Sequence, residues 1–151
     1  MPACKTRYFD TVDYTEDSLI CFPLGLPGFE EQREFVLIEQ QAYRPLLFLQ
    51  SLAAPGLCFA IMPIQAVEPG YKLRMRGEDL QLIGLNRGRQ PRIGRDVFCG
   101  AILASHEEEP TANLMAPIVI NLRTRVAVQA IQVDTSWSHC HALTARELVA
   151  C

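Results

Sequence analysis

The sequence predicts a mainly β fold, a small antiparallel barrel-like or sandwich domain with one or two short helices. Its apolar runs are short and stop at proline, glycine or charged residues, which is typical of strands and not of long helices. Several runs alternate apolar and polar residues with the period of two that a half-buried strand needs. Many short strands joined by irregular turns favour an antiparallel barrel or sandwich.

Chain length and composition support one folding unit. At 151 residues with 49% hydrophobic content, the chain can bury a core without disulfides or metals. We therefore expect residues 1–151 to form a single β domain, with 138–151 as a short helical or flexible tail. Within that tail, Thr144–Glu147 matches a helix capping box, which favours a short terminal helix.

In the first half of the chain, strands are expected where turn residues bound an apolar run. A weak alternation covers 5–12. Stronger runs predict strands over 18–22, 35–38, 46–52 and 57–62. The last two flank a Pro-Gly turn and predict a central hairpin buried on both faces. Two prolines and two glycines in Pro23–Phe29 predict a structured turn, and Glu30–Arg33 fits one helical turn.

The middle of the chain combines a strand, a helix and a loop. Tyr71, Leu73 and Met75 alternate with polar residues and predict a strand over 71–75. Residues 77–85 predict a short helix that ends near Gly84. The glycine, proline and arginine that follow predict a loop over 86–91.

Further strands are expected in the last third. A long strand is predicted over 92–105, with one face formed at a period of two by Val97, Cys99, Ala101 and Leu103. Charged residues and Pro110 break it at 106–111. Residues 117–121 and 125–133 then predict another strand pair.

Positive and negative charges are unevenly distributed, although the net charge is only −3. Residues 1–70 carry four basic and nine acidic residues, a balance of −5, whereas residues 71–100 have a balance of +4. The basic segment 72–95 fits either a solvated arginine-rich loop or an RNA-binding module. The only aromatic residues near this segment are Tyr71 and Phe98, so stacking of single-stranded RNA on it has little support. We expect no direct nucleic-acid binding, and the acidic first half suits a basic protein partner.

The six cysteines do not predict a disulfide framework or a zinc site, because no two have C-x-x-C spacing. Cys58 and Cys99 lie in apolar runs, where a free thiol behaves as a small buried hydrophobic group. Met1–Tyr8 lacks the apolar stretch of a secretory signal, and no run approaches the roughly 18 apolar residues of a membrane-spanning helix. We expect reduced thiols, no membrane association and a cytoplasmic location.

Residues that could catalyse a reaction are sparse. The sequence has no G-x-S-x-G, Walker, G-x-G-x-x-G or H-E-x-x-H motif. His139-Cys140-His141 is the one cluster of soft metal ligands, and a site there would need more ligands, with Cys151 the nearest in sequence. An exposed polar tail explains the same residues. We expect a protein that is not an enzyme, with no catalytic residue, metal or cofactor.

Three sequence blocks resemble the flagellar assembly factor family FliW. The first is Phe22–Glu30 (FPLGLPGFE), the second is Leu49–Leu52 (LQSL), and the third is Asn113–Asn121 (NLMAPIVIN), with Gln129 eight residues later. The blocks have the family's order and spacing, and the resemblance covers roughly residues 5–137. The first and third blocks together are specific, whereas the tail after Trp137 departs from the family pattern.

The resemblance implies a non-enzymatic cytoplasmic protein with a small antiparallel, barrel-like β fold. Members of this family bind the translational regulator CsrA and relieve its repression of flagellin mRNA, and they also bind flagellin. Flagellin in the cytoplasm occupies the family member, so CsrA stays free and represses. Export of flagellin releases the family member. It then binds CsrA at a site away from the RNA-binding surface of CsrA.

We place the partner-binding surface at the first block and at the asparagines of the third. The expected residues are Pro27, Gly28, Phe29, Glu30, Glu31, Asn113 and Asn121. Loops on a rigid scaffold often carry function, and the acidic residues complement a basic partner. Two structural interpretations stay open. The glycines and prolines can serve turn geometry alone, and the asparagines can shape a loop-to-strand corner through hydrogen bonds to the backbone.

Overall fold

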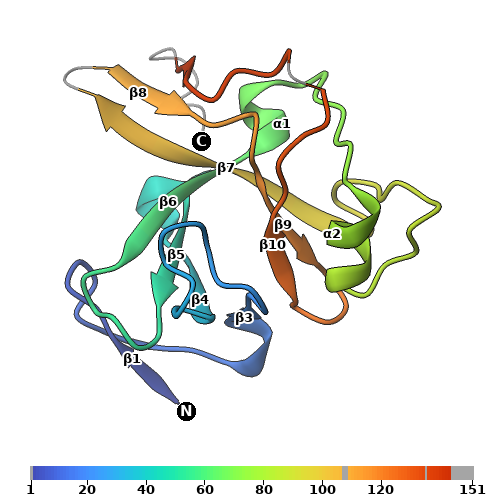
Figure 1. Cartoon of the computed structure of the whole chain (residues 1–151). Helices are drawn as coiled ribbons and strands as arrows, with labels where there is room; N and C mark the ends of the chain where they lie inside the picture. The colour runs from blue at the N-terminus through green and yellow to red at the C-terminus, as the bar shows by residue number, and fades with distance from the viewer. Residues whose placement is uncertain (1, 107–108, 135, 144–151) are drawn as a thin grey trace.

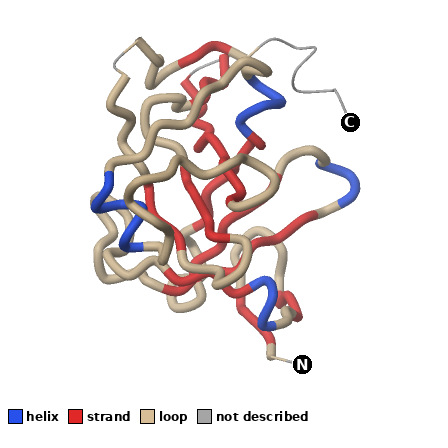
Figure 2. Tube along the Cα trace, turned by 90° about the vertical axis from the view of Figure 1, so that its right-hand side faces the viewer, coloured by secondary structure: helices blue, strands red, loops and turns tan. Residues whose placement is uncertain are grey.

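The computed structural model describes residues 2–106, 109–134 and 136–143, and these residues are mainly β. The strands are β1 (Ala3–Lys5), β2 (Thr11–Asp13), β3 (Leu19–Cys21), β4 (Glu34–Glu39), β5 (Leu47–Ser51), β6 (Cys58–Pro63), β7 (Val97–His106), β8 (Glu109–Ala112), β9 (Ile118–Asn121), β10 (Ala127–Gln129) and β11 (His141–Ala142). The helices are α1 (Ile64–Val67) and α2 (Gly77–Leu82), with 3-10 turns η1 (Glu16–Ser18) and η2 (Gln41–Tyr43). Figure 2 shows the helices at the periphery and the strands through the middle. The predicted mainly β class with short helices is confirmed.

One curved sheet organises the molecule. Its strands follow the order β10-β9-β7-β6-β5-β4-β3, each pair antiparallel, and β7 also pairs with β8, which pairs with β11. The two ends of this path meet, because the Cys21 N–H donates to the Arg125 carbonyl at 3.0 Å and Cys21 bridges Val126. This single contact gives a barrel-like shape without a closing ladder (Figure 1).

Each face of the curved sheet packs against its own apolar cluster. Along β4, Phe35 joins a cluster with Phe22 and Leu49, whereas the next residue, Val36, packs on the opposite face. On that opposite face the β1–β2 hairpin covers β4 and β5, and α1, α2 and the segment between them cover β6 and β7. Leu49 and Gln50 are adjacent in β5, so their side chains point to opposite faces of the sheet, and both are 0% exposed. The prediction that the β5–β6 hairpin is buried on both faces is therefore confirmed at these two residues.

Most expected strands are present, with adjusted ends. The four runs predicted in the first half correspond to β3, β4, β5 and β6, and α2 stops before Gly84 as predicted. The long strand begins at Val97 and not at 92, because the Asp96 N–H donates to the Arg92 carbonyl at 2.9 Å and closes a turn. The second member of the last strand pair is shorter than 125–133 and is limited to β10.

The predicted strand over 71–75 is wrong, although its alternation is real. Tyr71, Leu73 and Met75 are buried, but no other strand pairs with this segment in the described residues. Glutamine side chains take the place of a neighbouring strand. Gln90 accepts from the Met75 N–H at 2.8 Å and donates to its carbonyl at 3.0 Å, and Gln132 accepts from the Arg74 N–H at 2.8 Å.

Of three further expectations, two need correction and one is confirmed in part. Glu30–Arg33 forms no helix, only a turn in which the Gln32 N–H donates to the Phe29 carbonyl at 3.0 Å. The predicted break of the long strand at 106–111 is confirmed, because β7 ends at His106, although Pro110 lies within the next strand, β8. A helical or flexible tail over 138–151 is wrong at His141–Ala142, which pair with β8. The capping box Thr144–Glu147 lies outside the described residues.

The helices α1 and α2 are far too short to cross a lipid bilayer, and the described part of the chain contains no helix that could.

Gly100 in β7 leaves no room for a side chain against β6. A Cβ there would overlap the Cγ2 of Ile61 and would lie 2.7 Å from the Phe98 ring. We expect Gly100→Ala to lower the free energy of unfolding by about 1–3 kcal/mol, the usual cost of overpacking a core. Gly70→Ala is the control, since its nearest contact is Glu68 at 3.5 Å. Equal urea midpoints for the two variants would contradict this account.

The buried Cys4 and Cys99 thiols and the half-buried Cys58 thiol predict a loss of stability at alkaline pH. Burial raises the pKa of Cys58 to about 11 and also raises the pKa of Cys99 and Cys4. Above the ordinary thiol pKa of about 8.5, only the unfolded chain ionises at these positions, so stability falls as pH rises toward 11. We expect Cys58→Ala to flatten the fall of Tm with pH, and the exposed Cys21→Ala to leave it unchanged. Identical slopes in all three proteins would refute the assignment.

Candidate partner-binding surface

The turn between β3 and β4 is anchored by two buried side chains and presents Leu24 and Phe29 to solvent. Phe22 is 0% exposed and Leu26 is 2% exposed, whereas Leu24 is 64% exposed and Phe29 is 42% exposed. The Phe22 N–H donates to the Arg33 carbonyl at 2.7 Å and ties the two ends of the turn together. The alternation of anchors and exposed residues therefore makes a fixed loop with apolar contact points.

Two glycines give this turn its shape. The Phe29 N–H donates to the Leu26 carbonyl at 2.7 Å around Pro27 and Gly28, and the Gly28 φ is +87°. Proline followed by a residue with positive φ is the pattern of a type II turn. Gly25 has φ +66°, and a Cβ there would lie 2.5 Å from the Glu30 carbonyl oxygen. The geometric interpretation of both glycines is therefore supported.

Acidic side chains surround the turn. The Glu30 carboxylate accepts the Gly28 N–H at 3.1 Å, and this hydrogen bond lowers the pKa of Glu30 below its ordinary value. Glu31 and Glu34 line an adjacent recess of about 510 Å³, which Arg33 and the β5–β6 turn also border. We call Leu24, Phe29, Glu30, Glu31 and Glu34 the turn surface. It combines apolar contact points with three exposed carboxylates.

Aromatic rings connect the turn surface to the core. Phe29 meets Phe59 edge-on with ring centroids 5.7 Å apart, Phe59 lies 6.3 Å from Phe35, and Phe35 lies 5.3 Å from Phe22. Edge-to-face pairs of this kind stabilise beyond the area they bury. The exposed Phe29 is therefore connected to the core through a continuous series of ring contacts.

The second sequence block holds the neighbouring turn in place. Gln50 Nε2 donates to the carbonyls of Ala54 and Pro55, both at 3.2 Å. Ser51 Oγ accepts the Ala54 N–H at 3.0 Å and bonds Gln32 Oε1 at 2.8 Å. Through Gln32, this block fixes the recess beside the turn surface.

The two asparagines of the third block form hydrogen bonds that shape the local backbone. Asn113 Oδ1 accepts the N–H groups of Met115 and Ala116 at 3.0 and 3.1 Å, and Gln129 Nε2 donates to the Ala116 carbonyl at 3.1 Å. Asn121 is 2% exposed; its Nδ2 donates to the Ile83 carbonyl at 2.7 Å and its Oδ1 accepts from the backbone of Arg123. These contacts support the corner-shaping interpretation, and none of these hydrogen bonds joins either asparagine to the turn surface.

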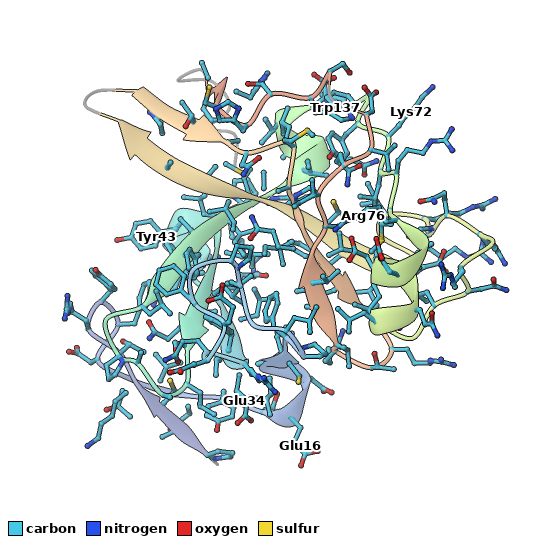
Figure 3. All side chains as sticks on the ribbon, viewed as in Figure 1. Glu16, Glu34, Tyr43, Lys72, Arg76 and Trp137 are labelled. Carbon is cyan, nitrogen blue, oxygen red and sulfur yellow. The ribbon has the colours of Figure 1, made fainter. Side chains whose placement is uncertain are left out.

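An aromatic hollow is a feature that sequence patterns did not indicate. Tyr8, Phe9, Tyr43 and Phe48 line a cavity of about 380 Å³ with Cys58 and Ala60. Tyr8 is 61% exposed and Tyr43 is 51% exposed, and Figure 3 shows Tyr43 projecting from the sheet. Tyr8 and Phe9 come from one segment of the chain, and Tyr43 and Phe48 come from another. The sequence shows that these residues are aromatic but not that the fold brings them together.

The His139-Cys140-His141 cluster does not assemble a ligand set in the described residues. His139 and Cys140 are exposed, and His141 belongs to β11. Across the ranges that the structure describes, no three His, Cys, Asp or Glu side chains come together to hold a metal ion.

Comparison with known proteins gives consistent matches. A family model described as FliW protein matches residues 3–143. The flagellar assembly factor FliW of Geobacillus sp. (strain WCH70) is 33% identical over 140 residues, covering 91% of this chain and 92% of the relative. That of Nitratidesulfovibrio vulgaris (strain DP4) is 35% identical over 122 residues, covering 81% and 69%. A crystal structure of the flagellar assembly factor FliW superposes with a TM-score of 0.80 at 30% identity, covering 95% of this chain and 97% of the other.

These matches extend over nearly all of the sequence and include the three blocks whose hydrogen bonds shape the turns. Fold, sequence and block order agree, and the chain belongs to the FliW family.

Proposed function

We propose that this protein is a cytoplasmic flagellar assembly factor that acts by binding other proteins and not by catalysis. Family membership is the observation that carries the proposal, because the relatives are named flagellar assembly factors. The whole chain acts as one domain, and its rigid turns present contact residues. A binding role needs a fixed surface of this kind.

The partners are CsrA and flagellin, as the family resemblance implies. Binding to CsrA relieves repression of flagellin mRNA, and cytoplasmic flagellin sequesters the protein. The physical principle is mass action, since two ligands that exclude each other set one another's occupancy through their free concentrations. Export of flagellin then frees the protein for CsrA.

The turn surface is the contact for this switch. Its carboxylates complement a basic partner such as an RNA-binding regulator. Leu24 and Phe29 add exposed apolar area, which suits the apolar face of an amphipathic helix in flagellin. One mixed surface can thereby engage either partner and exclude the other.

Binding of the purified protein to purified CsrA and to purified flagellin tests the proposal. We expect a complex with each by isothermal titration calorimetry, and displacement of CsrA when flagellin is added. No complex with either partner would overturn the function. Simultaneous binding without mutual effect would overturn the switch.

Charge reversal at the turn surface should slow CsrA association. For Glu30→Lys with Glu31→Lys, we expect a roughly tenfold lower on-rate at low salt, because attraction between opposite charges accelerates encounter. Asp13→Lys with Glu68→Lys changes the net charge equally at other positions and serves as the control. Stopped-flow association at two ionic strengths measures the effect, and an unchanged on-rate would refute the placement.

The two phenylalanines of the turn should separate binding from stability. Phe29→Ala removes a side chain that is 42% exposed, so we expect weaker partner binding and a stability loss limited to about 1 kcal/mol. Phe22→Ala removes a fully buried ring and should cost about 3–5 kcal/mol. Thermal unfolding with binding titrations checks both. Equal destabilisation would mean that Phe29 is a core residue.

A further inference from the structure

An extended segment between α1 and α2 presents basic side chains along one edge. Lys72, Arg74 and Arg76 are exposed, and the residues between them face the core. In an extended chain, alternate side chains on one side repeat at about 6.6–6.8 Å. We call these three residues the cationic comb. Figure 3 shows Lys72 and Arg76 on the same side of the molecule.

The comb is held rigidly although it is not part of a sheet. Gln132 is 3% exposed, accepts the Arg74 N–H at 2.8 Å and donates to the Ala130 carbonyl at 3.1 Å. Gln90 exchanges two hydrogen bonds with the Met75 backbone. These bonds fix the spacing of the basic side chains before any partner arrives, which reduces the ordering cost of binding.

The loop after α2 extends the positive surface. A Cβ at Gly77 would lie 2.9 Å from Arg87 Nε, so the Arg87 side chain lies directly over the residue that follows the comb. Arg87 Nη1 also donates to Gln81 Oε1 at 3.1 Å, which holds the guanidinium there. Glycine at 77 leaves the space that this arrangement uses.

Most of this positive charge has no acidic partner within the described part of the chain. The ion pairs of this region join Arg76 to Glu78 at 3.7 Å and to Asp79 at 3.4 Å. Among the described residues, Lys72, Arg74 and Arg87 are in no ion pair. Exposed, unpaired and preorganised cations favour an anionic partner.

Exposed aliphatic residues beside the comb favour a protein over RNA. Ile131 is 46% exposed and Val133 is 65% exposed, and they flank Gln132, which bonds the comb backbone. No aromatic side chain is among the large apolar groups exposed in the described part of 72–95, so a base-stacking platform is absent there. Aliphatic side chains next to cations match an amphipathic acidic peptide.

We propose that the cationic comb, with Arg87, Ile131 and Val133, binds an acidic segment of a protein partner in extended conformation, with carboxylates at alternate positions. Such a segment repeats its carboxylates at the same spacing of about 6.6–6.8 Å as the comb. Arginine binds carboxylates through a rigid pair of donors, which adds geometric selectivity to charge. This surface is separate from the turn surface and does not depend on the proposed function.

A fluorescent peptide of about ten residues that alternates Glu and Leu tests the proposal by anisotropy. We expect salt-sensitive binding that falls at least about tenfold in Lys72→Gln with Arg74→Gln and Arg87→Gln. The control variant Lys5→Gln with Arg7→Gln and Arg33→Gln removes equal charge elsewhere and should bind within about twofold of wild type. Ile131→Ser with Val133→Ser should also weaken binding.

Two further probes separate the possible outcomes. A peptide of the same composition with its Glu residues in one block should bind more weakly, because its carboxylates do not match the comb. A uridine oligonucleotide of similar length should bind more weakly than the alternating peptide. If the oligonucleotide bound more tightly than the peptide, and the variant with Lys72→Gln, Arg74→Gln and Arg87→Gln lost this binding, RNA binding would replace the proposal. Absent peptide binding, equal loss in the control variant, or equal affinity for both peptides would overturn it.

Heteronuclear chemical-shift mapping on the wild-type protein tests the same placement without substitutions. On addition of the alternating peptide, we expect the largest amide shifts in the comb and at Ile131 and Val133. Shifts concentrated on the turn surface would overturn the proposal.

Discussion

Hydrogen bonds from side-chain amides to the backbone are the interaction on which the rest of this structure depends. The strands are short, and β3 and β10 have only three residues each, so ladders leave many buried backbone groups without partners. Amides supply the missing partners in the turns and in the extended segment before α2. They belong to Gln50, Gln90, Gln129, Gln132, Asn113 and Asn121.

These amides also explain two of the three blocks that resemble the FliW family, the second and the third. Polar amides next to apolar residues in these blocks are explained by their hydrogen bonds to the backbone. They are Gln50, Asn113 and Gln129. Each bonds backbone groups of a turn that lies outside the strand ladders, which helps that turn to hold one conformation. The cationic comb is made rigid in this way, whereas the turn surface is held by the buried Phe22 and Leu26 side chains and by backbone hydrogen bonds.

Local patterns predicted the parts of the fold whose causes are local. The apolar run of β4 and the Pro-Gly turn after β5 carry their own signals, as does the turn around Pro27 and Gly28. The segment 71–75 has the alternation of a strand, but its partners are side chains from residues 90 and 132, which no window of sequence contains. The same limit applies to the site. The turn that carries Phe29 and Glu30 could be predicted from the prolines and glycines of its block, whereas the hydrogen bond from Asn121 to the Ile83 carbonyl depends on the tertiary fold.

The unequal distribution of charge has a consequence for motion in solution. Glu16 and Glu34 lie at one end of the molecule, and Lys72 and Arg76 lie toward the other (Figure 3). A net charge of −3 with separated signs gives the molecule an electric dipole. A charged neighbour therefore exerts a torque as well as a force, and it turns the molecule before contact. Because screening acts over about 8 Å at physiological salt, this alignment operates only over the last stretch of approach, which is much shorter than the molecule itself, and it selects which end arrives first.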